Sequence, residues 1–298
     1  MNAVFVIDKP AGLTSHDVVN RARRILGQRS VGHLGTLDPS ATGVLPIVVG
    51  SFTRLAQFYM HSEKTYEGTI RFGFSTDTYD ADGSPTSEPQ SIVLGSERIR
   101  TLAAEFQGTL EQVPPPFSAK KIAGVPAYKF ARKQQEVTLR PVQVDIQEFT
   151  VLEVAGDQAT FRAHVGSGTY MRSIAHDMGQ RLGCGAHLAK LRRTAVAEFR
   201  IEEARTLEEL GSAAREGTGE GVLALSVHPR KLLVNMPCVA VTDESAALIR
   251  SGRAVNLPEL SRAPRVKVFY GQRQLLAIAT RVAGTLFHPG IVFATDGK

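Results

Sequence analysis

An aspartate in a glycine-rich loop is the residue of this sequence best suited to covalent chemistry. Asp38 lies between Leu37 and Pro39 in the stretch GHLGTLDPSATGVLP at 32–46, which has glycines at positions 32, 35 and 43. Glycine lets a ligand or another backbone segment approach closely, and a positioned carboxylate can act as a nucleophile. An aspartate before proline is also typical of a simple turn. The local pattern therefore leaves a catalytic and a structural interpretation open.

Other reactive residue types give weaker signals. His33 is a candidate for base stacking or acid–base chemistry, although many such histidines are only structural. The sequence has no GxxxxGK[ST] loop, no GxGxxG between a strand and a helix and no HExxH spacing, so we expect neither a cofactor nor a metal. The two cysteines, Cys184 and Cys238, form no CxxC pair, which argues against a disulfide scaffold, a zinc site and an iron–sulfur cluster.

The positive charge is confined to two segments. The formal net charge is +6. Residues 114–141 carry six basic side chains and one acidic side chain, and residues 232–298 carry eight basic and four acidic side chains. Phe117, Tyr128 and Phe130 interleave with the lysines of the first segment, which would allow base stacking as well as phosphate contacts. This pattern indicates an electropositive nucleic-acid surface, although a solvated basic loop would look similar.

The elements that must position these residues follow from the apolar spacing. We expect strands at 4–7, 45–49, 66–74, 142–154 and 159–165. Helices are expected at about 14–26 with Gly27 beyond the end, 51–59, 97–106 and from the loop GSGTYMRS to about Leu182. Residues 32–46 are expected to be an ordered loop and TDTYDADG at 76–83 a polar turn. Residues 188–199 are expected to begin as a turn and continue as a strand.

Two domains are expected. The stretch 211–222 (GSAAREGTGEGV) is interpreted as a surface connection, and after Leu232 short β-like pieces surround one helix at 244–250. This pattern of short strands over about 65 residues is typical of a small β-barrel. We therefore predict an α+β catalytic domain at 1–231 and a C-terminal β module at 232–298. No segment approaches the roughly 18 apolar residues of a membrane span, and Met1–Pro10 does not resemble a secretory signal.

Seven motifs in order carry a resemblance to a known family. They are KPAGLTSHDVV at 9–19, GHLGTLDPSATGVLPI at 32–47, KTYEGTIRFG at 64–73, TDTYDADG at 76–83, PPPFSAKKIAGVPAY at 114–128, SGTYMRSIAHDMG at 167–179 and HLAKLRRT at 187–194. Residues 4–231 thereby resemble the TruB family of bacterial tRNA pseudouridine synthases. The C-terminal module is similar to the PUA domain, an RNA-binding β-barrel, with a looser match.

The resemblance implies a fold, an activity and a partner. The fold would be a large mixed or antiparallel sheet flanked by helices, followed by the PUA-like β-barrel. The activity would be isomerisation of the uridine at position 55, in the T-loop of tRNA, after the base is flipped out. No metal or cofactor would be needed. The partner would be the T-arm of tRNA, and the protein would be a monomer with no membrane and no obligatory protein partner. The two unpaired cysteines separately indicate a reducing cytoplasm.

The same resemblance implies roles for individual residues. Asp38 would be the catalytic nucleophile, and Arg172 would pair with it and favour its charged form. Tyr66 would stack on the target base and relay a proton. Tyr170 and Leu191 would line the pocket, and His33 would fill the space that the extruded nucleotide leaves.

Further positions of the resemblance concern RNA contacts. Asp80 and Arg54 match family positions near the site, with a charge-pairing or phosphate role. The basic segment 114–141 would be an insertion that closes over the T-arm. Its candidate phosphate contacts are Lys120, Lys121, Arg132 and Lys133.

Three other functions fit part of the pattern. The chain could be a non-catalytic RNA-binding or RNA-folding protein. It could be a glycosidase-like hydrolase that uses Asp38 with a second carboxylate such as Asp80. It could also be a guide-RNA-dependent pseudouridine synthase, which shares the core motifs but works within a multi-protein particle.

Overall fold

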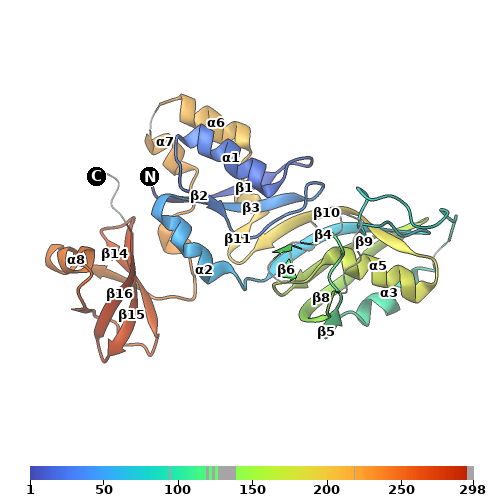
Figure 1. The fold of residues 1–298 in the computed structure, drawn as a ribbon. Helices are drawn as coiled ribbons and strands as arrows, with labels where there is room; N and C mark the ends of the chain where they lie inside the picture. Colours follow the sequence, from blue (N-terminus) through green and yellow to red (C-terminus); the bar gives the residue numbers. More distant parts are fainter. Residues whose placement is uncertain (94, 119–120, 123–124, 127–138, 218, 294–298) are drawn as a thin grey trace.

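One mixed sheet of nine strands forms the larger part of the molecule (Figure 1). The computed structural model describes residues 1–93, 95–118, 121–122, 125–126, 139–217 and 219–293 of the 298. The strand order is β1-β3-β10-β4-β9-β8-β5, with β2 paired to β3 and β11 paired to β10. The strands are β1 (Ala3–Lys9), β2 (Val31–His33), β3 (Thr42–Val49), β4 (Lys64–Phe72), β5 (Gly108–Gln112), β8 (Val142–Ala155), β9 (Gln158–Val165), β10 (Ala186–Val196) and β11 (Phe199–Arg200). A short hairpin, β6 (Lys121–Ile122) with β7 (Val125–Pro126), stands apart from this sheet.

Strand β10 joins the two halves of the sheet. It runs antiparallel to β4 over Ala186–Val196 and parallel to β3 at two pairs, Arg192 with Thr42 and Arg193 with Gly43. Gly43 has φ +100°, and a Cβ atom there would lie 2.2 Å from the carbonyl oxygen of Arg193. Only glycine lets the two backbones approach this closely. The loop of residues 34–41 between β2 and β3 is anchored at this crossing, and it is named the catalytic loop for the role that the sequence predicts for Asp38.

Helices cover the sheet at both ends (Figure 1). Helices α1 and α6 pack together beside β1–β3, whereas α3 contacts β8 and α5 contacts β10. The α-helices are α1 (Ser15–Leu26), α2 (Ala56–Tyr59), α3 (Ser96–Ala104), α5 (Met171–Leu182), α6 (Leu207–Arg215), α7 (Gly219–Ala224) and α8 (Asp243–Arg250). The described residues also form three 3-10 turns: η1 (Gly50–Leu55), η2 (Ile201–Glu203) and η3 (Pro229–Lys231). None of the described helices is long and apolar enough to span a bilayer.

The helix that precedes the catalytic loop forms as its sequence predicts. Thr14 is the N-cap of α1 and makes a capping box with Asp17, and Gly27 ends the helix in the left-handed region with φ 60°. Val18, Val19 and Ala22 are buried on one face. This cap and this apolar spacing, both local signals, are why the helix bounds agree with the prediction.

The structure corrects four sequence expectations. The stretch 211–222 is not a simple connection, because helix α6 ends and helix α7 begins within it. Residues 188–199 do not begin as a turn, since β10 already starts at Ala186. The loop expected over 32–46 is shortened by β2 and β3. The helix expected at 51–59 is mostly the 3-10 turn η1, with one α-helical turn in α2. Each error arises where tertiary packing determines the local structure, because the spacing of apolar residues does not reveal that packing.

A second sheet makes up the C-terminal region (Figure 1). Its strand order is β12-β14-β15-β16-β13, and α8 packs against β13, β15 and β16. The strands are β12 (Cys238–Val241), β13 (Val255–Asn256), β14 (Arg265–Tyr270), β15 (Gln274–Ala283) and β16 (Leu286–Val292). The described strands form a curled half-barrel. The predicted β-strands are therefore confirmed, but the described strands do not close into a barrel.

The two sheets share a hydrophobic core. Phe52 of η1 packs edge-on against Phe293 with ring centroids 5.1 Å apart. Val4, Val6 and Val48 of the large sheet belong to the same buried cluster as Phe269, Leu275 and Ile291. The boundary expected at residue 232 therefore runs through a packed interface.

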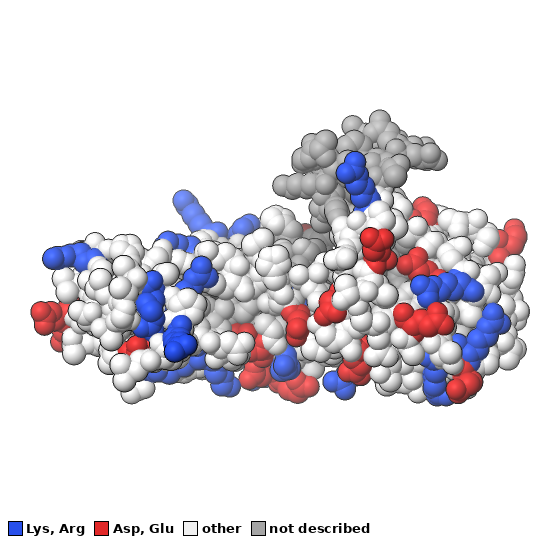
Figure 2. Space-filling view, turned by 90° about the horizontal axis from the view of Figure 1, so that it is seen from below, with Lys and Arg blue, Asp and Glu red and all other residues white. Residues whose placement is uncertain are grey.

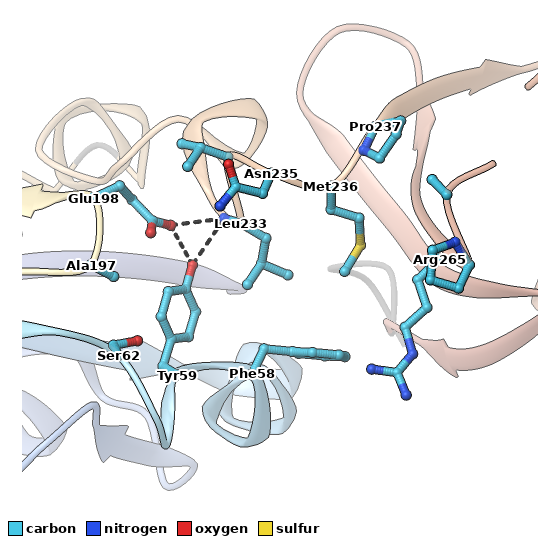
Figure 3. Close-up of a pocket in the computed structure, with 13 residues that line it drawn as sticks. Phe58, Tyr59, Ser62, Ala197, Glu198, Leu233, Asn235, Met236, Pro237 and Arg265 are labelled. Atoms are coloured by element: carbon cyan, nitrogen blue, oxygen red, sulfur yellow. Dashed lines mark hydrogen bonds between the residues drawn. The ribbon is translucent and has the colours of Figure 1, made fainter. Parts of the chain in front are cut away.

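Polar contacts close one side of this interface (Figure 3). The Tyr59 hydroxyl donates to a Glu198 carboxylate oxygen at 2.5 Å, and the Leu233 amide donates to the same oxygen at 2.8 Å. Leu233 itself has φ 52°. These groups form one wall of a cavity of about 410 Å³ whose other side carries Met236 and Arg265. The cavity lies between the sheets and away from Asp38.

Charge is unevenly distributed on the face seen from below Figure 1 (Figure 2). Blue Lys and Arg side chains predominate over the C-terminal sheet at the left, whereas red and blue side chains intermingle over the large sheet at the right. The described C-terminal residues keep the basic excess that the sequence indicated.

Candidate active site

A pocket of about 220 Å³ opens where the catalytic loop, β4, β10 and the start of α5 meet. Five residues that the sequence singled out line it: Asp38, Tyr66, Tyr170, Arg172 and Leu191. They come from four segments spread over more than half of the chain. The order of the sheet brings them together, because β10 lies between β3 and β4.

Arg172 holds the carboxylate of Asp38. Its Nε lies 3.0 Å from Asp38 Oδ2, and the Arg172 side chain is 7% exposed whereas that of Asp38 is 42% exposed. The guanidinium also donates to the Thr78 and Phe117 carbonyl oxygens at 3.2 and 3.0 Å. These contacts fix the arginine in place, and the carboxylate keeps one side open to a ligand. The predicted Asp38–Arg172 pair is thus formed.

Asp80 is a second partner of the same guanidinium. Its Oδ2 lies 3.4 Å from Arg172 Nη1, and its other oxygen accepts from the Thr78 hydroxyl at 2.5 Å and from the Asp82 amide at 3.2 Å. Burial raises the pKa of Asp80, against the opposing effects of Thr78 and Arg172. Asp80 is therefore close to the site, as predicted, but lies behind the arginine.

Three buried polar side chains clamp the catalytic loop. The Ser15 hydroxyl accepts from the Leu37 amide at 2.8 Å and donates to the Leu37 carbonyl at 3.1 Å. The Lys9 ammonium donates to the Pro39 carbonyl at 3.1 Å. Arg193 donates to the carbonyl oxygens of Gly35, Thr36 and Val44 at 3.0, 3.2 and 2.9 Å. Both flanks of Asp38 are thereby fixed to β1, α1 and β10.

A glutamine fixes the helix end that carries Arg172. The buried Gln112 amide group donates to the Tyr170 carbonyl at 3.1 Å and accepts from the Tyr170 backbone N–H at 2.8 Å. One turn on, the Ser173 hydroxyl donates to the Val113 carbonyl at 2.8 Å. The start of α5 is therefore held to the end of β5, and burial raises the pKa of the Tyr170 hydroxyl in this position.

Tyr66 and Lys64 share one face of β4. They are two residues apart on the strand, so both side chains point to the same side of the sheet, and both line the pocket. The fully buried Arg193 guanidinium lies near the Tyr66 side chain. Tyr66 is 7% exposed and lines the pocket, so its ring is held in a fixed place at the pocket wall.

The remaining predicted residues lie apart from the pocket or outside the described part. His33 is in β2, its Nδ1 is buried without a hydrogen-bond partner among the described residues, and burial lowers its pKa. Arg54 does not line the pocket, because its guanidinium donates to the Val292 carbonyl of the C-terminal sheet at 3.0 Å. Lys120, Arg132 and Lys133, and the side chain of Lys121, fall outside the described residues.

Several positioning residues were missed by the sequence reasoning. Lys9 and Ser15 lie in the KPAGLTSHDVV motif and Arg193 in the HLAKLRRT motif, so their motifs were noticed although the residues were not singled out. Lys64 had the same kind of signal in KTYEGTIRFG. Gln112 had none, because it only ends an ordinary strand.

Comparisons with known proteins agree with this geometry. The family model described as TruB family pseudouridylate synthase (N terminal domain) matches residues 23–171, and the model of the tRNA pseudouridylate synthase B C-terminal domain matches residues 172–234. A tRNA pseudouridine synthase B of Solibacter usitatus is 50% identical over 295 residues, which cover 98% of this chain and 100% of the relative. The chain belongs to the TruB family. The corresponding protein of Bacillus cytotoxicus is 40% identical over 287 residues, 93% of this chain and 92% of the relative.

Solved structures show the same fold. A chain of a crystal structure of a Cbf5–Nop10–Gar1 complex superposes with a TM-score of 0.70 and 26% identity, covering 99% of this chain and 84% of that one. A chain of an archaeal box H/ACA sRNP Nop10–Cbf5 complex gives a TM-score of 0.70 and 25% identity, covering 98% and 86%. The TruB-family chain thus has the pseudouridine synthase fold, with mixed sheets, flanking helices and the curled C-terminal sheet.

Proposed function

We propose that this protein converts uridine to pseudouridine in the T-loop of tRNA, at position 55, with Asp38 as the nucleophile. The conversion of uridine in tRNA is the activity for which its TruB-family relatives are named. The observation that carries the assignment to Asp38 is its half-exposed carboxylate, held at 3.0 Å by the buried Arg172 in a pocket floored by Tyr66 and Leu191.

The reaction balances within the substrate. The bond between N1 of uracil and C1′ of ribose breaks, the base rotates, and C5 bonds to C1′. C5 then loses its proton and N1 gains one, so no oxidant, metal or co-substrate enters. Asp38 would attack C1′ or C6, or assist a glycal intermediate, and Tyr66 would stack on the uracil and relay the proton from C5.

A uridine in a folded T-loop must be flipped out to reach this pocket. Flipping a base out costs a few kcal/mol, and stacking on an aromatic ring returns part of that cost. Tyr66 offers the ring, and His33 would fill the vacated space. The basic segment 114–141 would close over the T-arm, and the curled C-terminal sheet, as a PUA-like module at 232–298, would add phosphate contacts. We propose catalysis on residues 1–231, as a monomer in the cytoplasm.

The contacts of Asp80 count against a hydrolase. A second carboxylate that activates water needs access to the reacting face. Asp80 is 7% exposed and is engaged by Arg172, Thr78 and the Asp82 amide. A guide-RNA-dependent enzyme is the second candidate, because one of the superposed structures is an archaeal box H/ACA sRNP complex. The 50% identity over nearly the whole chain to a tRNA pseudouridine synthase B favours the stand-alone enzyme.

Tritium release tests the proposal. An unmodified tRNA transcript carrying tritium at C5 of its uridines is incubated with the purified protein alone, beside the Asp38→Asn variant. We expect about one equivalent of tritium per tRNA from the wild type and none from the variant, with tRNA affinity nearly unchanged because the substitution is isosteric. Near-normal turnover by Asp38→Asn would remove Asp38 from the nucleophile role.

The same assay separates the alternatives. Release that requires added guide RNA or proteins would support the guide-dependent enzyme, and free uracil among the products would support the hydrolase. Salt-sensitive binding without any release would indicate a non-catalytic tRNA-binding protein.

A further inference from the structure

Lys64 is a charged residue of the active-site pocket to which the proposed reaction gives no role. It is the first residue of β4 and lines the pocket with Asp38 and Arg172. Its ammonium donates to the Ser62 carbonyl at 2.6 Å. The other pocket cation, Arg172, is already matched by Asp38 and Asp80. Among the described residues, no carboxylate lies within 4.0 Å of the Lys64 ammonium.

The surroundings of Lys64 disfavour its charged ammonium form unless an anion binds beside it. Its side chain is half-buried, and the Cα of Gly35 lies close enough that a Cβ there would be 3.7 Å from Lys64 Cε and 3.5 Å from Arg193 Nη1. Lys64 therefore sits beside a fully buried guanidinium of the same sign. Burial, and then the charge of Arg193, lowers the pKa of Lys64 to about 8. A ligand anion next to the ammonium would relieve both effects.

The substrate brings such an anion. Once Tyr66 packs on the flipped base and Asp38 faces the ribose, the sugar–phosphate backbone of that nucleotide must pass the pocket mouth. A lysine ammonium is a compact point charge that binds phosphate well and tolerates several phosphate orientations. Lys64 lies two residues before Tyr66 on the same face of β4, so a phosphate bound to it would lie near the stacked base.

We propose that Lys64 is a subsite for a backbone phosphate that flanks the target uridine. The proposal rests on the proposed function, because it takes the flipped uridine to be the ligand of this pocket. Lys64 thereby binds and orients the substrate, and takes no part in bond breaking or proton transfer.

Binding of chemically altered RNA tests this subsite directly. The full chain carrying Asp38→Asn, alone or with Lys64→Met, is titrated with T-arm stem–loops whose phosphate on the 5′ or the 3′ side of the target uridine is a neutral methylphosphonate. We expect Lys64→Met to weaken binding of unmodified RNA about tenfold, as for a charge-assisted contact, and to reduce the salt dependence by about one ion. One of the two methylphosphonates replaces the phosphate that Lys64 contacts. The proteins with and without Lys64→Met should bind that RNA with equal affinity.

Two controls make the result specific. Lys64→Arg keeps the charge and should restore affinity to within about threefold, which separates the charge from a folding defect. Lys231→Ala removes an exposed lysine that pairs with Glu203 at 3.3 Å, away from this pocket, and should leave the methylphosphonate effect intact.

The outcomes distinguish this subsite from the proposed reaction. An equal loss for Lys64→Met on all three RNAs would overturn the phosphate contact. The Lys64→Met variant that retains Asp38 could instead bind RNA with unchanged affinity and show a lower kcat. This result would also overturn the phosphate contact, because Lys64 would then act in the chemistry. Binding with Asp38→Asn does not need turnover, so a wild type that releases no tritium would refute the proposed reaction while the phosphate contact is still read out.

Discussion

Arg172 is one guanidinium between two carboxylates, and this sharing decides what each carboxylate can do. Asp38 meets it through Nε and keeps 42% of its side chain exposed, whereas Asp80 meets it through Nη1 and has a buried side chain. The same arginine also donates to two loop carbonyls. Asp38 is thus left free for a ligand, while Asp80 is a positioning residue behind it.

Tyr66 allows the proton-relay role to be separated from stacking. We expect Tyr66→Phe to bind tRNA within about threefold of wild type, because the ring is kept, and to lower kcat about 100-fold or more if the hydroxyl moves a proton. Tritium release under saturating tRNA measures kcat. The control is Tyr270→Phe, which removes an exposed hydroxyl bonded to Asp243. An unchanged kcat would restrict Tyr66 to stacking.

His176 gives the stability of the protein a pH dependence. Its ring stacks on Tyr79 with centroids 3.7 Å apart and 9° between planes, and its Nδ1 is buried without a partner among the described residues. Burial lowers the pKa of His176 below its usual value. The unfolded chain therefore takes up the proton more readily, and stability is lost as pH falls from the usual histidine range toward the lowered pKa. Tyr79 faces this ring, and burial raises the pKa of Tyr79 and of Asp177, the next residue along α5.

A single substitution tests this pH effect. We expect His176→Phe to keep the stack and to lose less unfolding free energy than the wild type between about pH 7.5 and about pH 5. Urea unfolding of both proteins at the two pH values measures the difference. The other histidines are common to both proteins and cancel in the comparison, so an identical pH dependence would contradict the role of His176.

At the scale of elements, the catalytic loop depends on neighbours far away in sequence. Ser15 at the start of α1 forms two hydrogen bonds with the backbone of Leu37, next to Asp38. Ser15→Ala would leave a buried amide without this partner, at a cost of about 1–3 kcal/mol. We expect a lower Tm and a kcat reduced about tenfold or more, with tRNA affinity less affected, because misplacement of a nucleophile mainly costs rate.

A second serine provides the comparison. Ser30 donates from its exposed hydroxyl to the Gly50 carbonyl at 3.1 Å and does not touch the catalytic loop. Ser30→Ala should leave kcat unchanged in the tritium assay. Full kcat in Ser15→Ala would show that the loop holds its shape without this clamp.

Local signals allowed some of these elements to be predicted, and tertiary packing hid the rest. Helix α1 was predictable because its cap and its glycine stop are encoded within the helix itself. The Asp38–Arg172 pair was expected only through the family resemblance, since no spacing within the sequence links the two. Helices α6 and α7 were missed because their glycines mimic a loop, while the buried residues Leu207, Leu210 and Val222 contribute to the core. Gln112 could not be predicted, because its role arises only where β5 meets α5.

At the scale of the whole molecule, the C-terminal sheet is part of the folding unit. Phe293 is 2% exposed and packs on Phe52 of the large sheet. We expect Phe293→Ala to destabilise the protein by about 3–5 kcal/mol and to lower the Tm of the entire chain in one transition. Calorimetry measures the transition, and tRNA turnover after heating follows the catalytic part.

An exposed residue of the same sheet serves as the control. Val282 on β15 is 61% exposed, and Val282→Ala should change stability by no more than about 0.5 kcal/mol. Two separate transitions in Phe293→Ala, with the catalytic part melting as in the wild type, would mean that the shared core does not couple the sheets.

The place of β10 between β3 and β4 has a consequence for synthesis of the chain. Strands β3 and β4 leave the ribosome long before residues 186–196 do, yet the sheet order provides no direct pairing of one with the other. Until β10 arrives, each of them has an unpaired edge, which is a hazard for aggregation. The loop of Asp38 also lacks Arg193 during this time, and the pocket lacks Arg172 until the start of α5 has been made. A nascent chain shorter than about two thirds of its final length therefore has Asp38 but no complete pocket around it, and catalytic competence is acquired late.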